Sequence, residues 1–159
     1  MPTRREFIKL GGLGAVGLAA PTAAPAAPGP AARYPVVSIA PIERIARGGM
    51  LPFTYPDDGA PAILLRLHEP ALGGIGPNRE VVAYSTLCTH KGCPVLYKPD
   101  RKLIICPCHW STFDPAKGGV LVIGQASQNL PQIELRLERG IVQAVGVSGL
   151  IYGRHTNIV

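Results

Sequence analysis

Two short motifs decide how this chain folds: Cys88–Cys93 reads C-T-H-K-G-C, and Cys106–Ser111 reads C-P-C-H-W-S. Twelve residues separate them, and together they hold all four cysteines of the protein and two of its four histidines. Each motif offers one Cys and one His as metal ligands, spaced C-x-H in the first and C-x-x-H in the second, with one further Cys to spare. Two loops carrying these motifs side by side would therefore supply two thiolates and two imidazoles.

Three kinds of site could use these side chains. A structural zinc ion takes two Cys and two His in a tetrahedron, which leaves Cys93 and Cys108 without a role. An interpretation by disulfides alone accounts for the cysteines but not for a His at matching points in both motifs. A [2Fe–2S] centre with two Cys on one iron and two His on the other leaves the spare Cys of each motif free to bridge the loops. The motifs favour this centre over zinc.

The two motifs resemble the signature of Rieske iron–sulfur proteins, C-x-H-x-G-C followed by C-P-C-H-x-S. This resemblance implies one Rieske-type [2Fe–2S] cluster per chain, with two cysteines on one iron and two histidines on the other. The implied metal ligands are Cys88, His90, Cys106 and His109.

The same resemblance implies roles for other residues of the motifs. Cys93 and Cys108 would form a disulfide bond that ties the two loops together, as in the high-potential branch of the family. The Ser111 hydroxyl would donate a hydrogen bond toward the cluster sulfurs. Quinol-oxidising relatives have a second donor, a Tyr, at the position of Phe113, so here one donor is kept and the other lacks its hydroxyl. Trp110 would either shield the cluster or pack under its loop.

The composition of the chain predicts one β-rich domain with an extension. Of its 159 residues 47% are hydrophobic and 16% charged, and its 19 Gly and 17 Pro favour turns and short strands over long helices. The net charge of +6 falls to +4 when residues 1–26 are left out, with 13 basic and 9 acidic residues remaining. No basic run is interleaved with aromatic residues, so nothing indicates a nucleic-acid partner.

Residues 1–26 are interpreted as a twin-arginine signal peptide. Thr3–Lys9 reads T-R-R-E-F-I-K, which resembles the twin-arginine export motif, and the weakly apolar run Leu10–Ala20 follows it. The eleven residues of that run would reach only about 17 Å as a helix, whereas a membrane span needs ~30 Å. The mature protein is therefore expected in the periplasm without a stable membrane span, and residues 27–33 are expected to be a linker.

Residues 34–159 are predicted to form an all-β, Rieske-type domain, an antiparallel β-sandwich or barrel with a cluster-binding subdomain inserted at about residues 86–128. Apolar runs bounded by turn residues predict the strands, and Gln132–Glu138 alternates apolar and polar residues as a half-buried strand does. A hairpin that turns at Pro99–Arg101 would bring Cys93 and Cys106 together. The expected strands are Tyr34–Ala40, Ala62–Leu67, Glu80–Ser85, Val95–Lys98, Lys102–Ile105, Gly119–Ile123, Gln132–Glu138, Ile141–Val147 and Leu150–Tyr152.

Five short segments resemble the small, Rieske subunit of arsenite oxidase. The resemblance implies an electron-transfer subunit, not itself catalytic, which pairs with a large molybdopterin subunit that carries a [3Fe–4S] cluster and oxidises arsenite. Electrons would pass to a periplasmic cytochrome c or an azurin-type copper protein. The segments are F-T-Y-P at Phe53–Pro56, G-G-I-G-P-N at Gly73–Asn78, V-A-Y-S at Val82–Ser85, G-Q-A-S-Q-N-L-P at Gly124–Pro131 and G-L-I-Y-G-R at Gly149–Arg154.

Two other assignments remain open. Related molybdenum enzymes such as iodate reductase use similar Rieske subunits, and no residue here contacts a substrate that would tell them apart. The quinol-oxidising subunit of a cytochrome bc complex is disfavoured by the lack of an expected span.

Basic residues near the two motifs allow two interpretations. A solvated surface is the simpler one, and a docking surface for an acidic partner is the alternative. Only Asp100 and Asp114 oppose the basic side chains, which are Lys91, Lys98, Arg101, Lys102 and Lys117.

Overall fold

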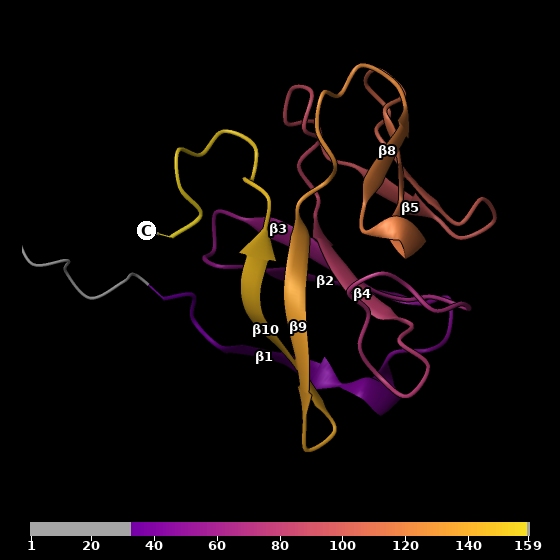
Figure 1. Cartoon of the computed structure of the whole chain (residues 1–159), viewed down its shortest axis with the longest axis vertical. Coiled ribbons are helices and arrows are strands. Elements are labelled where there is room, and N and C mark those ends of the chain that lie inside the picture. The colour runs from indigo at the N-terminus through magenta and orange to yellow at the C-terminus, as the bar shows by residue number, and fades with distance from the viewer. Residues whose placement is uncertain (1–32, 159) are drawn as a thin grey trace, which may run out of the picture. The chain divides into compact units, whose positions relative to one another are not determined.

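The computed structural model describes residues 33–158, which fold into two antiparallel sheets (Figure 1). A six-stranded sheet has the order β1-β10-β9-β4-β3-β2, and a four-stranded sheet has the order β5-β6-β7-β8. The prediction of an all-β antiparallel fold is confirmed. The predicted signal peptide, and all but the last residue of the predicted linker, lie outside the described residues.

Short strands and two single-turn 3₁₀ helices make up the regular structure of residues 33–158. The helices are η2 (Ile42–Arg44) and η3 (Pro115–Lys117), and neither is long enough to cross a membrane. The strands are β1 (Val37–Pro41), β2 (Met50–Thr54), β3 (Pro61–Arg66), β4 (Val81–Ser85), β5 (Leu96–Lys98), β6 (Leu103–Ile105), β7 (Thr112–Asp114), β8 (Val120–Ile123), β9 (Gln132–Glu138) and β10 (Ile141–Ser148).

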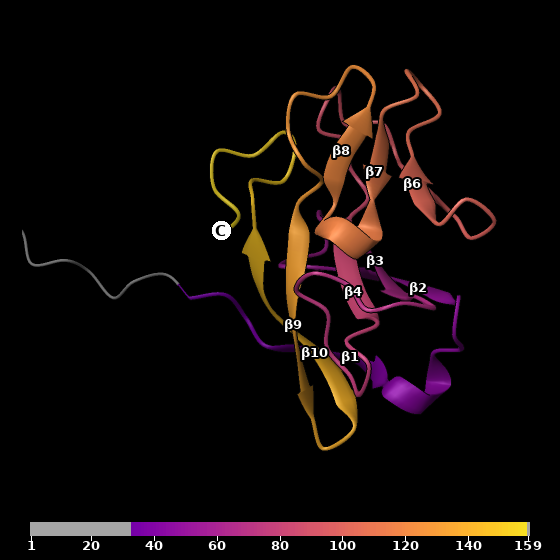
Figure 2. The same cartoon turned by 45° about the vertical axis from the view of Figure 1, so that its right-hand side comes forward.

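The six-stranded sheet buries apolar side chains on both of its faces. Successive residues of a strand point to opposite faces, so Ile63 and Leu65 of β3 pack in one core while Ala62 and Leu64 pack in the other. This explains why β3 and β4 read as continuous apolar runs. The first core also contains side chains of the four-stranded sheet. The small sheet therefore rests on the large one through a shared apolar layer. Figure 2 shows the strands of the two sheets from a second direction.

The prediction and the structure differ at three elements. β2 was not predicted because Pro52 interrupts its apolar pattern, yet β2 lies at the edge of its sheet, where a residue without an N–H is tolerated. β7 was not predicted because its three residues follow the second motif directly. The prediction of a last strand at Leu150–Tyr152 is wrong, since these residues form an irregular segment paired with no strand.

Side-chain contacts, not strand pairing, hold this C-terminal segment, residues 149–158, which we call the strap. The Asn157 side chain accepts a hydrogen bond from the Ile151 N–H at 2.9 Å and donates one to the Gly149 carbonyl at 2.7 Å. The Arg154 guanidinium donates to both carboxylate oxygens of Asp57, at 2.6 and 2.7 Å. The strap is thereby fixed to the loop between β2 and β3.

Candidate metal centre

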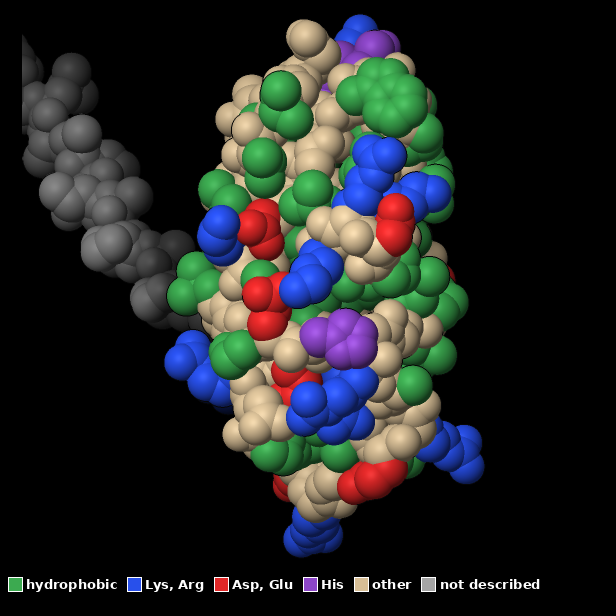
Figure 3. Space-filling model, turned by 90° about the vertical axis from the view of Figure 1, so that its right-hand side faces the viewer, with side chains coloured by type: hydrophobic (Ala, Val, Ile, Leu, Met, Phe, Trp, Pro, Cys, Tyr) green, Lys and Arg blue, Asp and Glu red, His purple; other side chains and the backbone are tan. Residues whose placement is uncertain are grey.

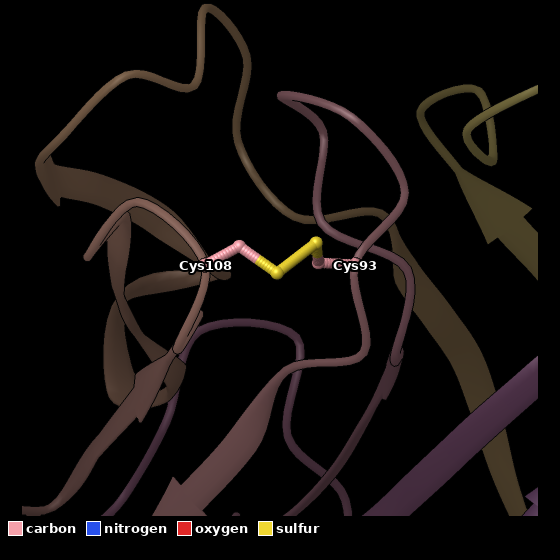
Figure 4. The surroundings of a disulfide bond; sticks show 2 residues. All are labelled: Cys93 and Cys108. Atoms are coloured by element: carbon pink, nitrogen blue, oxygen red, sulfur yellow. A yellow bond between two sulfur atoms is a disulfide. The ribbon is translucent and has the colours of Figure 1, made fainter.

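The two motifs form neighbouring loops at one end of the four-stranded sheet. The first loop, residues 88–93, lies between β4 and β5, and the second, residues 106–111, joins β6 to β7. A disulfide bond between Cys93 and Cys108 joins the loops across a sequence separation of 15 residues, as the resemblance implies (Figure 4).

The first loop closes on itself through two backbone hydrogen bonds. The Cys88 N–H donates to the Cys93 carbonyl at 2.9 Å, and the Gly92 N–H donates to the Cys88 carbonyl at 2.8 Å. Gly92 has a φ of +71°, in the left-handed region that glycine adopts without a steric penalty. This turn holds Cys88, whose side chain is buried, and His90 within one closed loop.

The second loop repeats the same turn. The Cys106 N–H donates to the Ser111 carbonyl at 2.8 Å, and the Trp110 N–H donates to the Cys106 carbonyl at 3.0 Å. Trp110 takes the place of the glycine, with a φ of +59°. The two loops therefore present Cys88 and Cys106 from equivalent positions, whereas His109 lies one residue further along its turn than His90 does.

The four expected ligands lie close together. The Cys88 and Cys106 side chains are buried, and the imidazole rings of His90 and His109 meet edge to face with their centroids 4.8 Å apart. The Cys106 sulfur also lies within 4.8 Å of both disulfide sulfurs, but those two sulfurs are bonded to each other and cannot act as thiolate ligands. The loops thus bring two free thiols and two imidazoles to one place.

One atom of this set indicates a bound metal. The His90 Nδ1 is buried and has no hydrogen-bond partner among the described residues. A buried polar atom without a partner is costly, whereas a metal ion would use its lone pair. The donor set fits a cluster that binds two thiolates and two imidazoles.

The Cys88 sulfur lies in surroundings that only partly favour its charged form. Burial raises the pKa of the Cys88 thiol above its ordinary value, and the neighbouring Cys106 thiol adds to the rise. Hydrogen bonds from the His90 N–H and the Ser111 hydroxyl oppose it. A metal cation would supply the positive charge needed to keep two neighbouring sulfurs deprotonated.

A third loop, residues 124–130, braces both motif loops. Its Ala126 N–H donates to the Ser111 Oγ at 3.0 Å, and its Gln128 carbonyl accepts from the Thr89 hydroxyl at 2.8 Å. With its oxygen accepting from Ala126, the fully buried Ser111 hydroxyl keeps its proton free to donate, and its interaction with the Cys88 thiol lowers the pKa of that thiol. A Cβ on Gly124 would lie 2.4 Å from the Ser111 Cα, so only glycine allows this approach.

The strap covers the first loop and leaves the second bare. A Cβ on Gly92 would lie 2.7 Å from the Tyr152 ring. On the second loop His109 is exposed, and Trp110 is 69% exposed. This exposure shows that one of the two roles suggested for Trp110, packing under its loop, is wrong.

The predicted subdomain at about residues 86–128 includes most of the third loop, but the contacts of the third loop and the strap with the motif loops were not predicted. They belong to Gly124–Pro131 and Gly149–Arg154, two of the segments that resemble the arsenite oxidase subunit. The polar composition of the first segment indicated a loop, and the apolar residues of the second suggested a strand, but neither indicated where its segment packs.

Comparison with known proteins identifies the family. Residues 37–134 match the family of the Rieske [2Fe-2S] domain. The chain is 39% identical over 159 residues to the iodate reductase subunit IdrB of Denitromonas iodatirespirans, covering 98% of this chain and 86% of that protein. It is 34% identical to the iodate reductase subunit IdrB of Pseudomonas sp. (strain SCT), covering 95% and 82%.

A solved structure shares the fold. The soluble domain of the Rieske protein II (soxF) from Sulfolobus acidocaldarius superposes with a TM-score of 0.65 at 24% identity, covering 78% of this chain and 85% of that one. The iron–sulfur interpretation is therefore preferred over zinc, and the cofactor is a Rieske-type [2Fe–2S] cluster. With its matched sequence, its fold and its two facing Cys–His loops, this chain belongs to the Rieske [2Fe–2S] family.

Proposed function

We propose that this protein is the electron-transfer subunit of a molybdenum oxidoreductase that acts on an oxyanion, of the kind represented by iodate reductase. The observation that carries electron transfer is the ligand set, in which two thiols are buried and one imidazole, that of His109, reaches the surface. When bound, the cluster supplies one-electron redox chemistry. The exposed imidazole then gives a short route between that cluster and a partner.

The chain's own residues would hold the cluster and limit how much it moves. Cys88 and Cys106 would bind one iron, and His90 and His109 the other. The disulfide fixes the separation of the loops, and the third loop orients the Ser111 hydroxyl toward the Cys88 sulfur. A rigid cradle of this kind favours rapid electron transfer, because little has to rearrange when the charge of the cluster changes.

We infer the partners of this subunit from the proteins that its sequence resembles. Both long alignments are with iodate reductase subunits, and the five segments resemble the arsenite oxidase small subunit. We therefore propose a large molybdopterin subunit carrying a [3Fe–4S] cluster as the permanent partner. A periplasmic cytochrome c or an azurin-type copper protein would exchange electrons with the pair, and the twin-arginine-like N-terminus supports this compartment.

Iodate is the favoured substrate of the partner, because iodate reductase subunits align with nearly the whole chain. Arsenite is the second candidate, supported by the five segments. The two substrates move electrons in opposite directions through this subunit. Iodate would oxidise a reduced cluster, whereas arsenite would reduce an oxidised one.

The Rieske EPR signal of the purified two-subunit complex can tell them apart, because only the reduced cluster is paramagnetic. Iodate added to the dithionite-reduced complex is expected to abolish the signal, and arsenite added to the oxidised complex should leave it absent. If the signal appears when arsenite is added, arsenite and not iodate is the substrate of the partner subunit. If neither compound changes the signal, an oxyanion of this kind is not the substrate.

A further inference from the structure

We propose that the second loop and the adjoining edge of the four-stranded sheet form a docking surface for a soluble electron-carrier protein with an acidic face. This inference rests on the proposed electron-transfer function and names the surface that serves it. The surface is built around Trp110.

A groove of about 360 Å³ lies beside the second loop. Its apolar part includes Trp110, which is 69% exposed, and Leu96, which is 48% exposed. Figure 3 views this face and shows apolar and basic side chains gathered below histidines at the tip. The residues that line the groove are Leu96, Lys98, Asp100, Arg101, Ile105, Pro107 and Trp110.

The groove lies where an electron can leave or enter. His109, an expected iron ligand, directly precedes Trp110 and is exposed. The corresponding part of the first loop is covered, because the Tyr152 ring of the strap packs against Gly92. A protein seated in the groove would therefore lie against the exposed ligand, while the strap blocks an equivalent approach over the first loop.

The charge around the groove selects the partner. Lys102 and Lys117 are paired with Glu69 and Asp114, each at 3.2 Å, and the Arg101 Nε lies 3.9 Å from Asp100. Within residues 33–158, by contrast, no carboxylate lies within 4.0 Å of Lys98, which lines the groove. The surface next to His109 thus keeps unneutralised positive charge, which attracts an acidic protein and steers its approach.

The chemistry of the groove fits a transient partner. Trp and Arg are, with Tyr, the residues most enriched among those that dominate binding energy at protein interfaces. Electron-transfer encounters bury less surface than permanent complexes do, and a single aromatic anchor with a charged rim suits such an encounter. A permanent subunit would be expected to cover Trp110 and Leu96 with a larger apolar face.

The test measures electron exchange between the intact two-subunit complex and two c-type cytochromes of opposite net charge, by stopped flow. At an ionic strength of about 0.01 M, where charges act over ~30 Å, Lys98→Glu is expected to slow exchange with the acidic cytochrome about five- to tenfold. The same variant should speed exchange with the basic cytochrome. At about 1 M salt both effects should shrink to less than about twofold.

The aromatic anchor is tested by a matched pair of substitutions. Trp110→Ala is expected to slow exchange with the acidic cytochrome about tenfold, while Trp110→Phe keeps most of the rate. The control for charge is Arg44→Glu on η2, which lies at the opposite end of the molecule from the motif loops (Figure 1) and should change neither rate. An unchanged EPR spectrum shows that each variant keeps its cluster.

Three results would overturn the proposal. An equal effect of Lys98→Glu on the two exchange rates would show that charge does not select the partner. Loss of the large subunit during purification of Trp110→Ala would make this surface the subunit interface instead. If the wild-type complex exchanges electrons with neither cytochrome, the carrier step of the proposed function itself fails.

Discussion

The two motif loops follow the same backbone turn but lie in opposite surroundings. Each closes through a pair of backbone hydrogen bonds and has a residue of positive φ at its fifth position, Gly92 in the first loop and Trp110 in the second. Gly92 packs beneath the Tyr152 ring, whereas Trp110 is 69% exposed. Binding the metal requires the shared turn, and the surroundings decide which loop is anchored in the protein and which one can meet a partner.

The difference has an energetic side. Glycine adopts a positive φ freely, whereas this conformation costs a residue with a Cβ about 1–2 kcal/mol of conformational free energy. Trp110 therefore carries a cost that a glycine would avoid, and its side chain, at 69% exposure, buries little surface in return. This indicates that the tryptophan serves the surface and not the stability of the loop.

Removing an imidazole tests the feature that the loops share. His90→Ala and His109→Ala are each expected to abolish the Rieske EPR signal, because either change destroys the two-histidine ligand set of one iron. His155→Ala, an exposed histidine outside both motifs, serves as the control and should keep the signal. A rhombic signal that survives either ligand change would contradict the assignment of ligands.

Cutting the bond between the loops tests their dependence on each other. The double change Cys93→Ser with Cys108→Ser is expected to lower the free energy of unfolding by about 3 kcal/mol, the value for a closed loop of about 15 residues. Guanidinium unfolding followed by circular dichroism measures this difference. A loss below about 1 kcal/mol would mean that the cluster and the third loop hold the two loops without the disulfide.

Substituting Gly92 and Trp110, the residues at the fifth position of each loop, tests the difference between the two loops directly. Gly92→Ala is expected to destabilise the protein by about 2 kcal/mol, because alanine resists the positive φ and its Cβ meets the Tyr152 ring. Trp110→Gly should be neutral or stabilising by up to about 1 kcal/mol. Adding Tyr152→Ala should recover only the steric part of the Gly92→Ala loss. Equal effects of the two single changes would show that the loops do not differ in this way.

The sequence predicted the parts of the site that chemistry fixes locally. The spacing of Cys and His in the two motifs indicated the cluster, and the alternation in Gln132–Glu138 predicted β9 with the bounds found in the structure. The turn at Pro99–Arg101 placed the two motifs next to each other. In each case the signal lies within a few neighbouring residues.

The sequence could not predict contacts between distant segments. Tyr152 lies 60 residues after Gly92, and only the folded chain shows that its ring covers that glycine. Leu150–Tyr152 has the apolar character of a strand. The Asn157 side chain nevertheless accepts the hydrogen bond of the Ile151 N–H, and Arg154 anchors the segment to Asp57, so no neighbouring strand is needed. The exposure of Trp110 likewise depends on what the strap leaves uncovered.

Removing the Ser111 hydroxyl tests how the surroundings of the second loop tune the cluster. Because Ser111 donates toward the Cys88 sulfur, Ser111→Ala is expected to lower the reduction potential by roughly 60 mV, or about 1.4 kcal/mol for one electron. Phe113→Tyr should raise the potential by a similar amount if its hydroxyl reaches a sulfur. Protein-film voltammetry measures both shifts. Thr112→Val, which removes an exposed hydroxyl bonded to the Trp110 carbonyl, should leave the potential unchanged.

Weakening the anchor of the strap should give the smallest effect. The Arg154 side chain, through its hydrogen bonds to Asp57, holds the pKa of that carboxyl below its ordinary value. Because the folded-state pKa is the lower one, the ion pair stabilises the protein above the ordinary pKa of Asp, and this contribution is lost as pH falls through the folded-state pKa. Asp57→Asn should thus lower Tm slightly at neutral pH, and the difference should disappear in acid. A difference independent of pH would mean that the carboxylate charge plays no part.

The position of the Cys106 sulfur bears on the order in which the protein matures. It lies within 4.8 Å of both sulfurs of the Cys93–Cys108 bond. In a chain without its cluster, a free Cys106 thiolate is placed to attack that bond, forming a new disulfide and releasing the displaced sulfur as a thiolate, with no net oxidation. With the expected ligands, iron would occupy the same sulfur once the cluster is in place. Inserting the cluster before the cysteines are oxidised would then leave only one pair of sulfurs able to join, and the metal would act as a protecting group for the correct disulfide.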